Sequence, residues 1–270
     1  MIPIPETLYR ASQVRELDRL AIEEYGTPGL QLMERAGVAA FQALRMQRPR
    51  ATKMLVLCGT GNNGGDGYVI ARLGLQVGMD VLVLSLASVD RLVGDALRMA
   101  EKYRAIQGPY EAYDCQDFSA YPLIVDAMLG TGFKGELRGL WAQAITALNS
   151  AQAAGNYVLS VDIPSGLNAD TGHRDTVAVQ ANLTVTFIGV KQGLLTADGP
   201  QLSGRLLFDD LAVDRRVYQK VNADVHRLDD RLVKKMLPRR VKNSHKGSFG
   251  KLLVVGSNPP YFGAARLSAL

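Results

Sequence analysis

The sequence contains little of what stabilises small secreted proteins or builds zinc sites. It has two cysteines, Cys58 and Cys115, and three histidines among its 270 residues. Two cysteines do not make a disulfide framework, and neither the cysteines nor the scattered histidines have the spacing of zinc ligands. We therefore expect a protein of a reducing, cytoplasmic compartment that uses no zinc.

A leader sequence and long apolar runs are also missing. Residues 1–6 lack the basic and apolar blocks of a signal peptide, and no segment approaches the roughly 20 apolar residues of a membrane helix. The net charge of +5 is modest, and basic residues are largely interspersed with acidic ones. The densest basic cluster, at 234–242, is interpreted as a solvated face or linker. We therefore expect neither a membrane nor a nucleic acid as a partner.

The hydrophobic content of 47% and charged content of 21% are those of a globular protein. Two helical patterns fill the first 50 residues, and strand, loop and helix patterns then alternate. The runs at 54–58, 81–84, 123–126 and 157–162 are apolar, as is typical of parallel strands buried on both faces. This order predicts a three-layer α/β/α, Rossmann-like, doubly wound and mostly parallel sheet. Its ligands are expected outside the carboxyl ends of the strands.

The pattern changes near residue 222. A helix is predicted at 224–237 and another buried strand at 252–256, and the chain ends at Leu270 inside a predicted helix. We expect one domain over 1–221, with a linker and the truncated start of a second α/β domain over 222–270.

A glycine-rich loop at 58–67 follows the first core strand. It contains a Gly-x-Gly-x-x-Gly pattern that begins at Gly59, which is typical of dinucleotide binding. The second strand ends with Leu-Ser-Leu at 84–86 rather than with the acid that holds a ribose, which disfavours a nicotinamide dehydrogenase. No Walker lysine follows, which excludes a P-loop NTPase. For Asp66, a first-turn helix acid and a ligand contact are equally good interpretations.

Two further strands end in a carboxylate and a polar glycine-bearing loop. Asp126 precedes the loop at 130–136, and Asp162 precedes the Ile-Pro-Ser-Gly-Leu loop at 163–167. Three such loops at one sheet edge predict a ligand site. Ser165 lacks the flanking glycines of a nucleophile elbow, so a serine hydrolase is disfavoured. For Lys191, the interpretation as a surface lysine is favoured over a role in the site.

Together the three loops resemble the NAD(P)H-hydrate epimerase family, of the YjeF N-terminal domain type. The strings that carry the resemblance are 61–67, 126–132 and 161–167, with support from 33–37 and 191–194, and it covers roughly residues 8–220. The string at 245–257 resembles the start of an ADP- or ATP-dependent NAD(P)H-hydrate dehydratase, which has a ribokinase-like fold. Residues 258–261 depart from that pattern, and the dehydratase's later motifs are absent.

The resemblance implies an isomerase that interconverts the R and S forms of NAD(P)H hydrate in cofactor repair, as the epimerase half of a bifunctional enzyme. A non-catalytic binding or scaffold module is the alternative. The implied catalytic residue is Asp162, with Lys134 or Lys191 as helpers. The implied substrate-binding residues are Asn62, Asn63, Gly64, Gly65, Asp66, Gly130, Thr131, Gly132, Phe133, Lys134, Gly135, Glu136 and Asp162. One potassium ion is expected on Asn63, Asp126 and Ser165, whose oxygen donors suit a hard cation. ADP or ATP is expected only as the cofactor of the dehydratase half. This chain alone should not catalyse the dehydration. We also expect a homo-oligomer.

Overall fold

The computed structural model describes residues 3–132, 135–174, 176–237, 242–245, 247–248, 251, 253–256 and 262–270. The chain forms two compact units, Met1–Arg227 and Leu228–Leu270. The boundaries expected from the sequence, 1–221 and 222–270, remain a prediction. Among the helices described, none is both long and apolar enough to cross a membrane.

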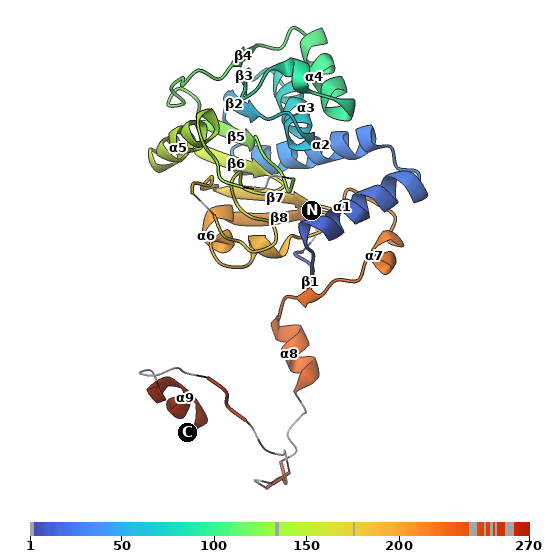
Figure 1. Ribbon diagram of the computed structural model, residues 1–270, viewed down its shortest axis with the longest axis vertical. Coiled ribbons are helices and arrows are strands. Elements are labelled where there is room, and N and C mark those ends of the chain that lie inside the picture. The colour runs from blue at the N-terminus through green and yellow to red at the C-terminus, as the bar shows by residue number, and fades with distance from the viewer. Residues whose placement is uncertain are drawn as a thin grey trace. The chain divides into compact units, whose positions relative to one another are not determined.

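A seven-stranded sheet forms the centre of the first unit (Figure 1). Every neighbouring pair in it is parallel, which confirms the predicted fold class. In spatial order the strands are β4 (Tyr110–Ala112), β3 (Asp80–Ser85), β2 (Lys53–Cys58), β5 (Leu123–Ala127), β6 (Tyr157–Val161), β7 (Leu183–Phe187) and β8 (Arg205–Asp209).

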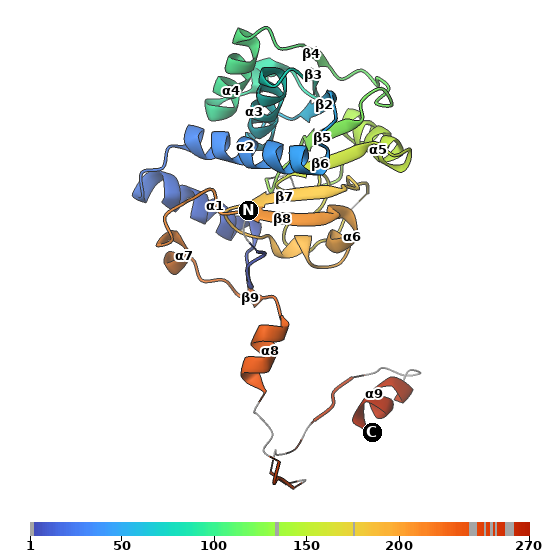
Figure 2. The same ribbon diagram turned by 180° about the vertical axis from the view of Figure 1, so that it is seen from behind.

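The alternation of side chains along the central strands explains why their sequences are continuously apolar. In β2, Met54, Val56 and Cys58 join one core cluster, whereas Leu55 and Leu57 join another. The first cluster is completed by α2 (Gly29–Gln47), α3 (Asn62–Gln76) and α4 (Gly94–Ala105), and the second by α5 (Leu140–Ala153). Figure 2 shows these helix groups on the two sides of the sheet. Each strand is therefore buried on both faces.

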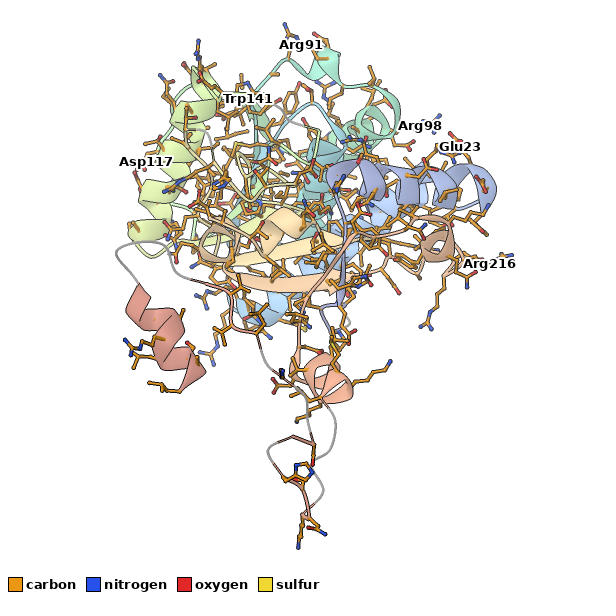
Figure 3. All side chains as sticks on the ribbon, turned by 60° about the horizontal axis from the view of Figure 1, so that its bottom comes forward. Glu23, Arg91, Arg98, Asp117, Trp141 and Arg216 are labelled. Carbon is orange, nitrogen blue, oxygen red and sulfur yellow. The ribbon has the colours of Figure 1, made fainter. Side chains whose placement is uncertain are left out.

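Charged side chains project from the outside of this unit. Figure 3 shows the labelled side chains of Glu23, Arg98 and Arg216 projecting from its surface, and all three are exposed. Glu23 lies in the single-turn π-helix Leu20–Glu24 that continues α1 (Ala11–Arg19), and Arg216 precedes α7 (Val217–Lys220). Another short helix, α6 (Gly199–Ser203), packs in a third core cluster with β8.

The strand order reverses at β2, whose two neighbours are β3 and β5. The chain leaves β2 toward one edge of the sheet and later returns to continue toward the other edge. The connections after β2 and β5 therefore lead to helices on opposite faces of the sheet, α3 and α5, and ligands of such sheets bind outside the carboxyl ends of the strands near this point. The sequence predicted this edge as the ligand-binding edge.

Some element boundaries differ from the prediction. The helix expected at 66–78 begins four residues earlier, at Asn62, and includes the glycines of the loop. A Cβ at Gly64 in this first turn would overlap the Gly59 carbonyl. The edge strand β4 was not predicted, since its three residues are exposed and carry no apolar pattern.

The helix predicted at 224–237 is wrong in its first part. Val225–His226 forms β9, which pairs antiparallel with β1 (Thr7–Leu8) and so belongs to the first unit. Helix α8 (Asp230–Met236) begins only after Asp229, whose carboxylate accepts a hydrogen bond from the Leu232 amide at 2.8 Å. An N-cap of this kind fixes where a helix starts.

The second unit contains α8 and α9 (Phe262–Ala269). The strand predicted at 252–256 is not observed in its described part, 253–256, where Leu253 and Val255 are exposed. Its residue 252 lies outside the described residues. An apolar run becomes a buried strand only where partner strands pair with it, and no pairing is assigned to these four residues.

Candidate functional site

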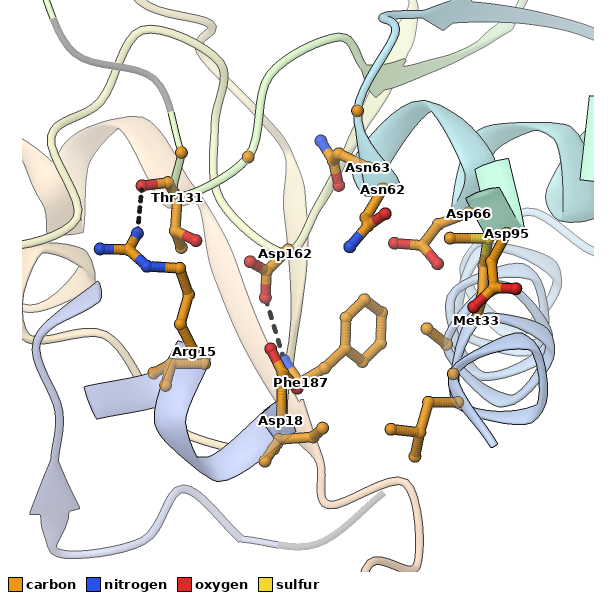
Figure 4. A pocket seen from close by; sticks show the side chains of 18 of the residues that line it. Arg15, Asp18, Met33, Asn62, Asn63, Asp66, Asp95, Thr131, Asp162 and Phe187 are labelled. Carbon is orange, nitrogen blue, oxygen red and sulfur yellow. Dashed lines mark hydrogen bonds between the residues drawn. The ribbon is translucent and has the colours of Figure 1, made fainter. Parts of the chain in front are cut away.

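A cavity of about 550 Å³ opens at the carboxyl ends of the strands (Figure 4). Helices α1 and α2 form one wall, and the loops after β2, β5 and β6 form the other. This volume lies within the range of small-molecule and cofactor sites. Its polar lining residues are Arg15, Asp18, Thr60, Asn62, Asn63, Asp66, Asp95, Thr131, Asp162 and Lys191.

The start of α3 brings backbone amides to this cavity. Gly61 is the extended N-cap of α3, and Asn62 and Asn63 form its first turn beside the cavity. The first amides of a helix have no partner within the helix and carry a partial positive charge, which favours an anion. Gly59 is required for packing, because a Cβ there would overlap the Met128 carbonyl oxygen of the neighbouring loop. The glycine pattern therefore brings the loops after β2 and β5 together.

Asp126, at the end of β5, lies beneath the cavity and is fully buried. Its carboxylate accepts hydrogen bonds from the Ser165 amide at 2.9 Å, the Ser160 hydroxyl at 2.8 Å, the Ser165 hydroxyl and the Met128 amide at 3.3 Å. Burial raises the pKa of this carboxyl, and the hydrogen bonds act against that rise. No lysine or arginine among the described residues pairs with it. Asp126 thus fixes the loop after β6 to the end of β5.

Asn63 extends this network into the cavity. Its amide nitrogen donates to the Leu129 carbonyl at 3.0 Å, and the Leu129 amide donates to the Ser165 hydroxyl at 2.9 Å. The side-chain oxygen of Asn63 is buried and has no hydrogen-bond partner among the described residues. A buried acceptor without a partner costs about 1–3 kcal/mol, so a water, ion or ligand is expected to bind there.

Asp162 and Lys191 form an ion pair inside the cavity. The Lys191 side chain is 1% exposed, and its ammonium also donates to the Thr186 hydroxyl at 3.1 Å and the Phe187 carbonyl at 3.3 Å. Asp162 follows β6 with φ of 67°, a left-handed conformation that costs a non-glycine residue of the order of 1–2 kcal/mol. The Phe187 amide donates to its Oδ1 at 3.3 Å. The interpretation of Lys191 as a surface residue was wrong, because the turn after β7 returns it beneath the end of β6.

Two more carboxyls surround this pair. Asp66 lies in the second turn of α3, so it is not the first-turn acid considered from the sequence. It lines the cavity, and burial followed by the charges of Asp162 and Asp18 raises its pKa. Asp18 projects from α1, and burial raises its pKa to about 7, with Lys191 acting against the rise. Three carboxyls therefore share one buried ammonium.

The structure brings part of the predicted substrate set to the cavity. Asn62, Asn63, Asp66, Gly130, Thr131, Gly132 and Asp162 line it. Gly64 and Gly65 do not: a Cβ at Gly64 would overlap the Gly59 carbonyl, and one at Gly65 would meet Met33 and Ala96. Glu136 pairs with Arg138 on the surface, and Gly135 is exposed. Phe133 and Lys134 lie outside the described residues.

Asp18 and Arg15 were missed by the sequence prediction. Both belong to α1, and both line the cavity. The signal was the place of Asp18 within the apolar stripe of that helix, four residues after Val14 and next to Leu17. A carboxylate on the buried face of an amphipathic helix is uncommon unless it has a function.

The chain matches a protein-family model. The family model described as "YjeF-related protein N-terminus" matches residues 29–193. Residues Arg15 and Asp18 lie before this range.

Several curated proteins are similar in sequence. The chain is 38% identical to an "NAD(P)H-hydrate epimerase" of Limosilactobacillus fermentum, over 76% of this chain and 97% of that protein. It is 37% identical to a protein of the same name from Rhodopirellula baltica, over 72% of this chain and 80% of that protein. It is 41% identical to the "Bifunctional NAD(P)H-hydrate repair enzyme Nnr" of Coxiella burnetii, over 97% of this chain and 53% of that protein. The chain thus spans about half the length of its bifunctional relatives.

A solved structure has the same fold. The crystal structure of the yeast protein YNL200c has a TM-score of 0.69, with 23% sequence identity over 80% of this chain and 93% of the yeast chain.

Proposed function

Because the chain belongs to the family of YjeF-related protein N-termini, we propose that it interconverts the R and S forms of NAD(P)H hydrate. This would make it an isomerase of cofactor repair. The observation that carries the proposal is the ion pair of Asp162 and Lys191 at the centre of a cavity that two glycine-bearing loops border.

The reaction inverts C6 of the hydrated nicotinamide ring. The hydroxyl must leave, or the ring must open, and the bond must form again on the other face. Either route needs one proton delivered and one removed, which a positioned acid/base group provides. Asp162 is our choice for this group, because its backbone and one of its oxygens are fixed by β7 and Lys191. Its other oxygen, Oδ2, accepts no hydrogen bond from the described residues.

The phosphates of the dinucleotide are assigned to the two glycine-bearing loops. Thr60, Gly61 and the first turn of α3 offer backbone amides on one side, and residues 130–132 border the cavity from the other. Helix amides and glycine-rich turns bind phosphate without a lysine. The remaining residues expected from the family for substrate binding, through Glu136, stay predictions.

A potassium ion fits the residues expected to hold it. Asn63 provides a buried oxygen without a partner, and Asp126 provides a buried negative charge that no basic residue balances among the described residues. Asn63 connects to Ser165 through the backbone of Leu129. Asp126 accepts a hydrogen bond from the Ser165 hydroxyl directly. When bound, the ion would add positive charge beside an anionic dinucleotide. Asn63, Asp126 and Ser165 would then keep the loops in the arrangement described above.

The direct test is a chromatographic measurement of R-to-S conversion of NADH hydrate and NADPH hydrate by the purified chain. We expect conversion well above the spontaneous rate, and a loss of about 100-fold or more in Asp162→Asn. Glu136→Gln changes a surface acid that pairs with Arg138. This variant tests the prediction that Glu136 contacts the substrate. Conversion at only the spontaneous rate by folded wild-type protein would refute the proposal.

We propose no dehydratase activity for this chain by itself, although residues 245–257 resemble the start of a dehydratase domain. ADP or ATP enters our proposal only as the cofactor of that second activity. Assembly as a homo-oligomer is likewise a proposal, which the mass of the purified protein in solution would test.

A further inference from the structure

Helix α1 carries a carboxyl into the cavity from the side that faces the end of β6. Val14 and Leu17 bury the helix against the core, and Asp18 follows on the edge of the same face. Figure 4 shows the Asp18 side chain pointing from α1 toward Asp162. Gly189 makes this close approach possible, because a Cβ there would meet Tyr9 at 2.9 Å and both Leu17 and Val14 at 3.2 Å.

Asp18 has no structural partner that would explain its position. It accepts no hydrogen bond and forms no ion pair with any residue that the structure describes. The nearby Arg19 is engaged by Glu16, Glu23 and Glu24. Asp18 is the penultimate residue of α1, which continues directly into the π-helix Leu20–Glu24, so it caps neither end. A partly buried carboxyl with no such role, beside an ion pair in a cavity, is a candidate for chemistry.

We propose that Asp18 is a second acid/base residue of the site, acting with Asp162 on the two faces of the hydrated nicotinamide ring. This inference rests on the proposed epimerase function. Because inversion removes the oxygen from one face and returns it to the other, two groups on separate elements serve it better than one.

Asp18 gives its proton to the C6 hydroxyl, and the C6–O bond breaks with its electron pair on the departing water. The lone pair of the ring nitrogen forms a double bond to C6. A water then adds to the other face, the electrons of that double bond return to nitrogen, and Asp162 accepts the proton that the water loses. The reverse epimerisation uses the same groups in exchanged roles, and solvent restores the starting protonation.

The electrostatic surroundings suit this exchange. The charged and titratable groups that act on or with Asp18 are Lys191, Asp162, Asp66 and Tyr218. Burial and Asp162 favour the protonated carboxyl, Lys191 favours the carboxylate, and the resulting pKa of about 7 keeps both forms populated near neutral pH. A group with its pKa near the working pH is the most effective acid/base catalyst. Burial and two neighbouring acids raise the pKa of Asp66 well above its usual range, which suits it to donate a hydrogen bond rather than to exchange a proton.

The test compares Asp18→Asn and Asp18→Glu with wild type, using the full chain and both hydrates. We expect Asp18→Asn to lower kcat by about 100-fold with KM changed by less than about threefold. The wild-type fall of kcat above pH 7, where Asp18 loses its proton, should be absent in this variant. Asp18→Glu should restore part of the rate and the pH dependence.

Glu16→Gln is the matched control, since Glu16 lies on the same helix, has a partly exposed side chain and pairs with Arg19. It should leave kcat and its pH profile unchanged. Thermal unfolding checks that each variant is folded. If Asp18→Asn does not fold, the rate and pH profile of Asp18→Glu are compared with those of wild type instead. Wild-type kcat and pH profile in folded Asp18→Asn would overturn the inference, and so would a rise of KM alone. Absence of epimerisation in wild type would instead refute the proposed function.

Discussion

The ammonium of Lys191 lies beneath the carboxylate of Asp162 and donates to its Oδ1, to the Thr186 hydroxyl and to the Phe187 carbonyl. The lysine is almost fully buried, whereas 18% of the Asp162 side chain remains exposed toward the cavity. The pair therefore fixes one oxygen of the carboxylate and leaves the other for a ligand.

Breaking this pair from one side should destabilise the protein more than removing both charges. Lys191→Met leaves Asp162 without its counter-ion, and Asp162→Asn leaves a buried ammonium, so we expect about 2–4 kcal/mol of lost unfolding free energy for each. The double variant should lose at least about 1 kcal/mol less than the sum of the two. Urea unfolding of the four proteins measures this coupling. Additive losses would show that the two charges do not interact appreciably.

Asparagine is also the replacement for Asp162 that disturbs the backbone least. Asp162 has a left-handed conformation, which asparagine tolerates better than other non-glycine residues. Asp162→Ala should therefore be less stable than Asp162→Asn by about 1 kcal/mol, although both lack the carboxylate. Equal midpoints in urea would contradict this account of the turn after β6.

Asp18 should make the stability of the protein depend on pH. Its pKa is raised from 3.8 to about 7 in the folded state, so the folded protein holds a proton that the unfolded chain releases between these values. This contribution is fully present below about pH 4 and is lost as the pH rises through 7. Relative to wild type, Asp18→Asn should gain of the order of 2 kcal/mol between pH 5 and pH 8. Parallel stability curves over this range would rule out the raised pKa.

Two glycines of the first loop should differ sharply in their tolerance of a methyl group. A Cβ at Gly59 would overlap the Met128 carbonyl, whereas Gly61 has no atom within 4 Å and does not need a left-handed backbone. We expect Gly59→Ala to lose about 3 kcal/mol or more, and Gly61→Ala to stay within about 0.5 kcal/mol of wild type. If phosphate lies against Gly61, that variant should nonetheless raise KM. A stable Gly59→Ala would mean that the loops after β2 and β5 can separate at little cost.

Potassium should stabilise the protein through Asn63. Binding of an ion to the folded state alone raises the unfolding free energy, and about 1 kcal/mol corresponds to a Tm increase of about 2–4 °C for a chain of this size. We expect such an increase in potassium chloride over choline chloride at equal ionic strength. Asn63→Ala should abolish it. An equal increase in the variant would show that the ion, or salt in general, acts elsewhere.

The sequence was sufficient for the architecture. Continuous apolar strands such as 54–58, alternating with helical patterns, allow few arrangements other than a parallel sheet covered on both faces. The carboxyl ends of parallel strands all lie at one edge, so the loops after Asp126 and Asp162 had to lie near the loop after Cys58. For this reason the sequence alone predicted the sheet edge at which the candidate cavity lies.

Only the tertiary structure decided what each polar residue does there. Asp126 and Asp162 have the same place in the sequence pattern, yet one is sealed beneath the loops and the other opens to the cavity. Lys191 is buried because a turn after β7 returns it under β6, and Asp18 enters because α1 packs across the strand ends. These pairings join residues that are far apart in the chain, and their charges act on one another through space. Local periodicity carries no information about such distances, which is why it could find the edge of the sheet but could not assign the carboxyls within the site.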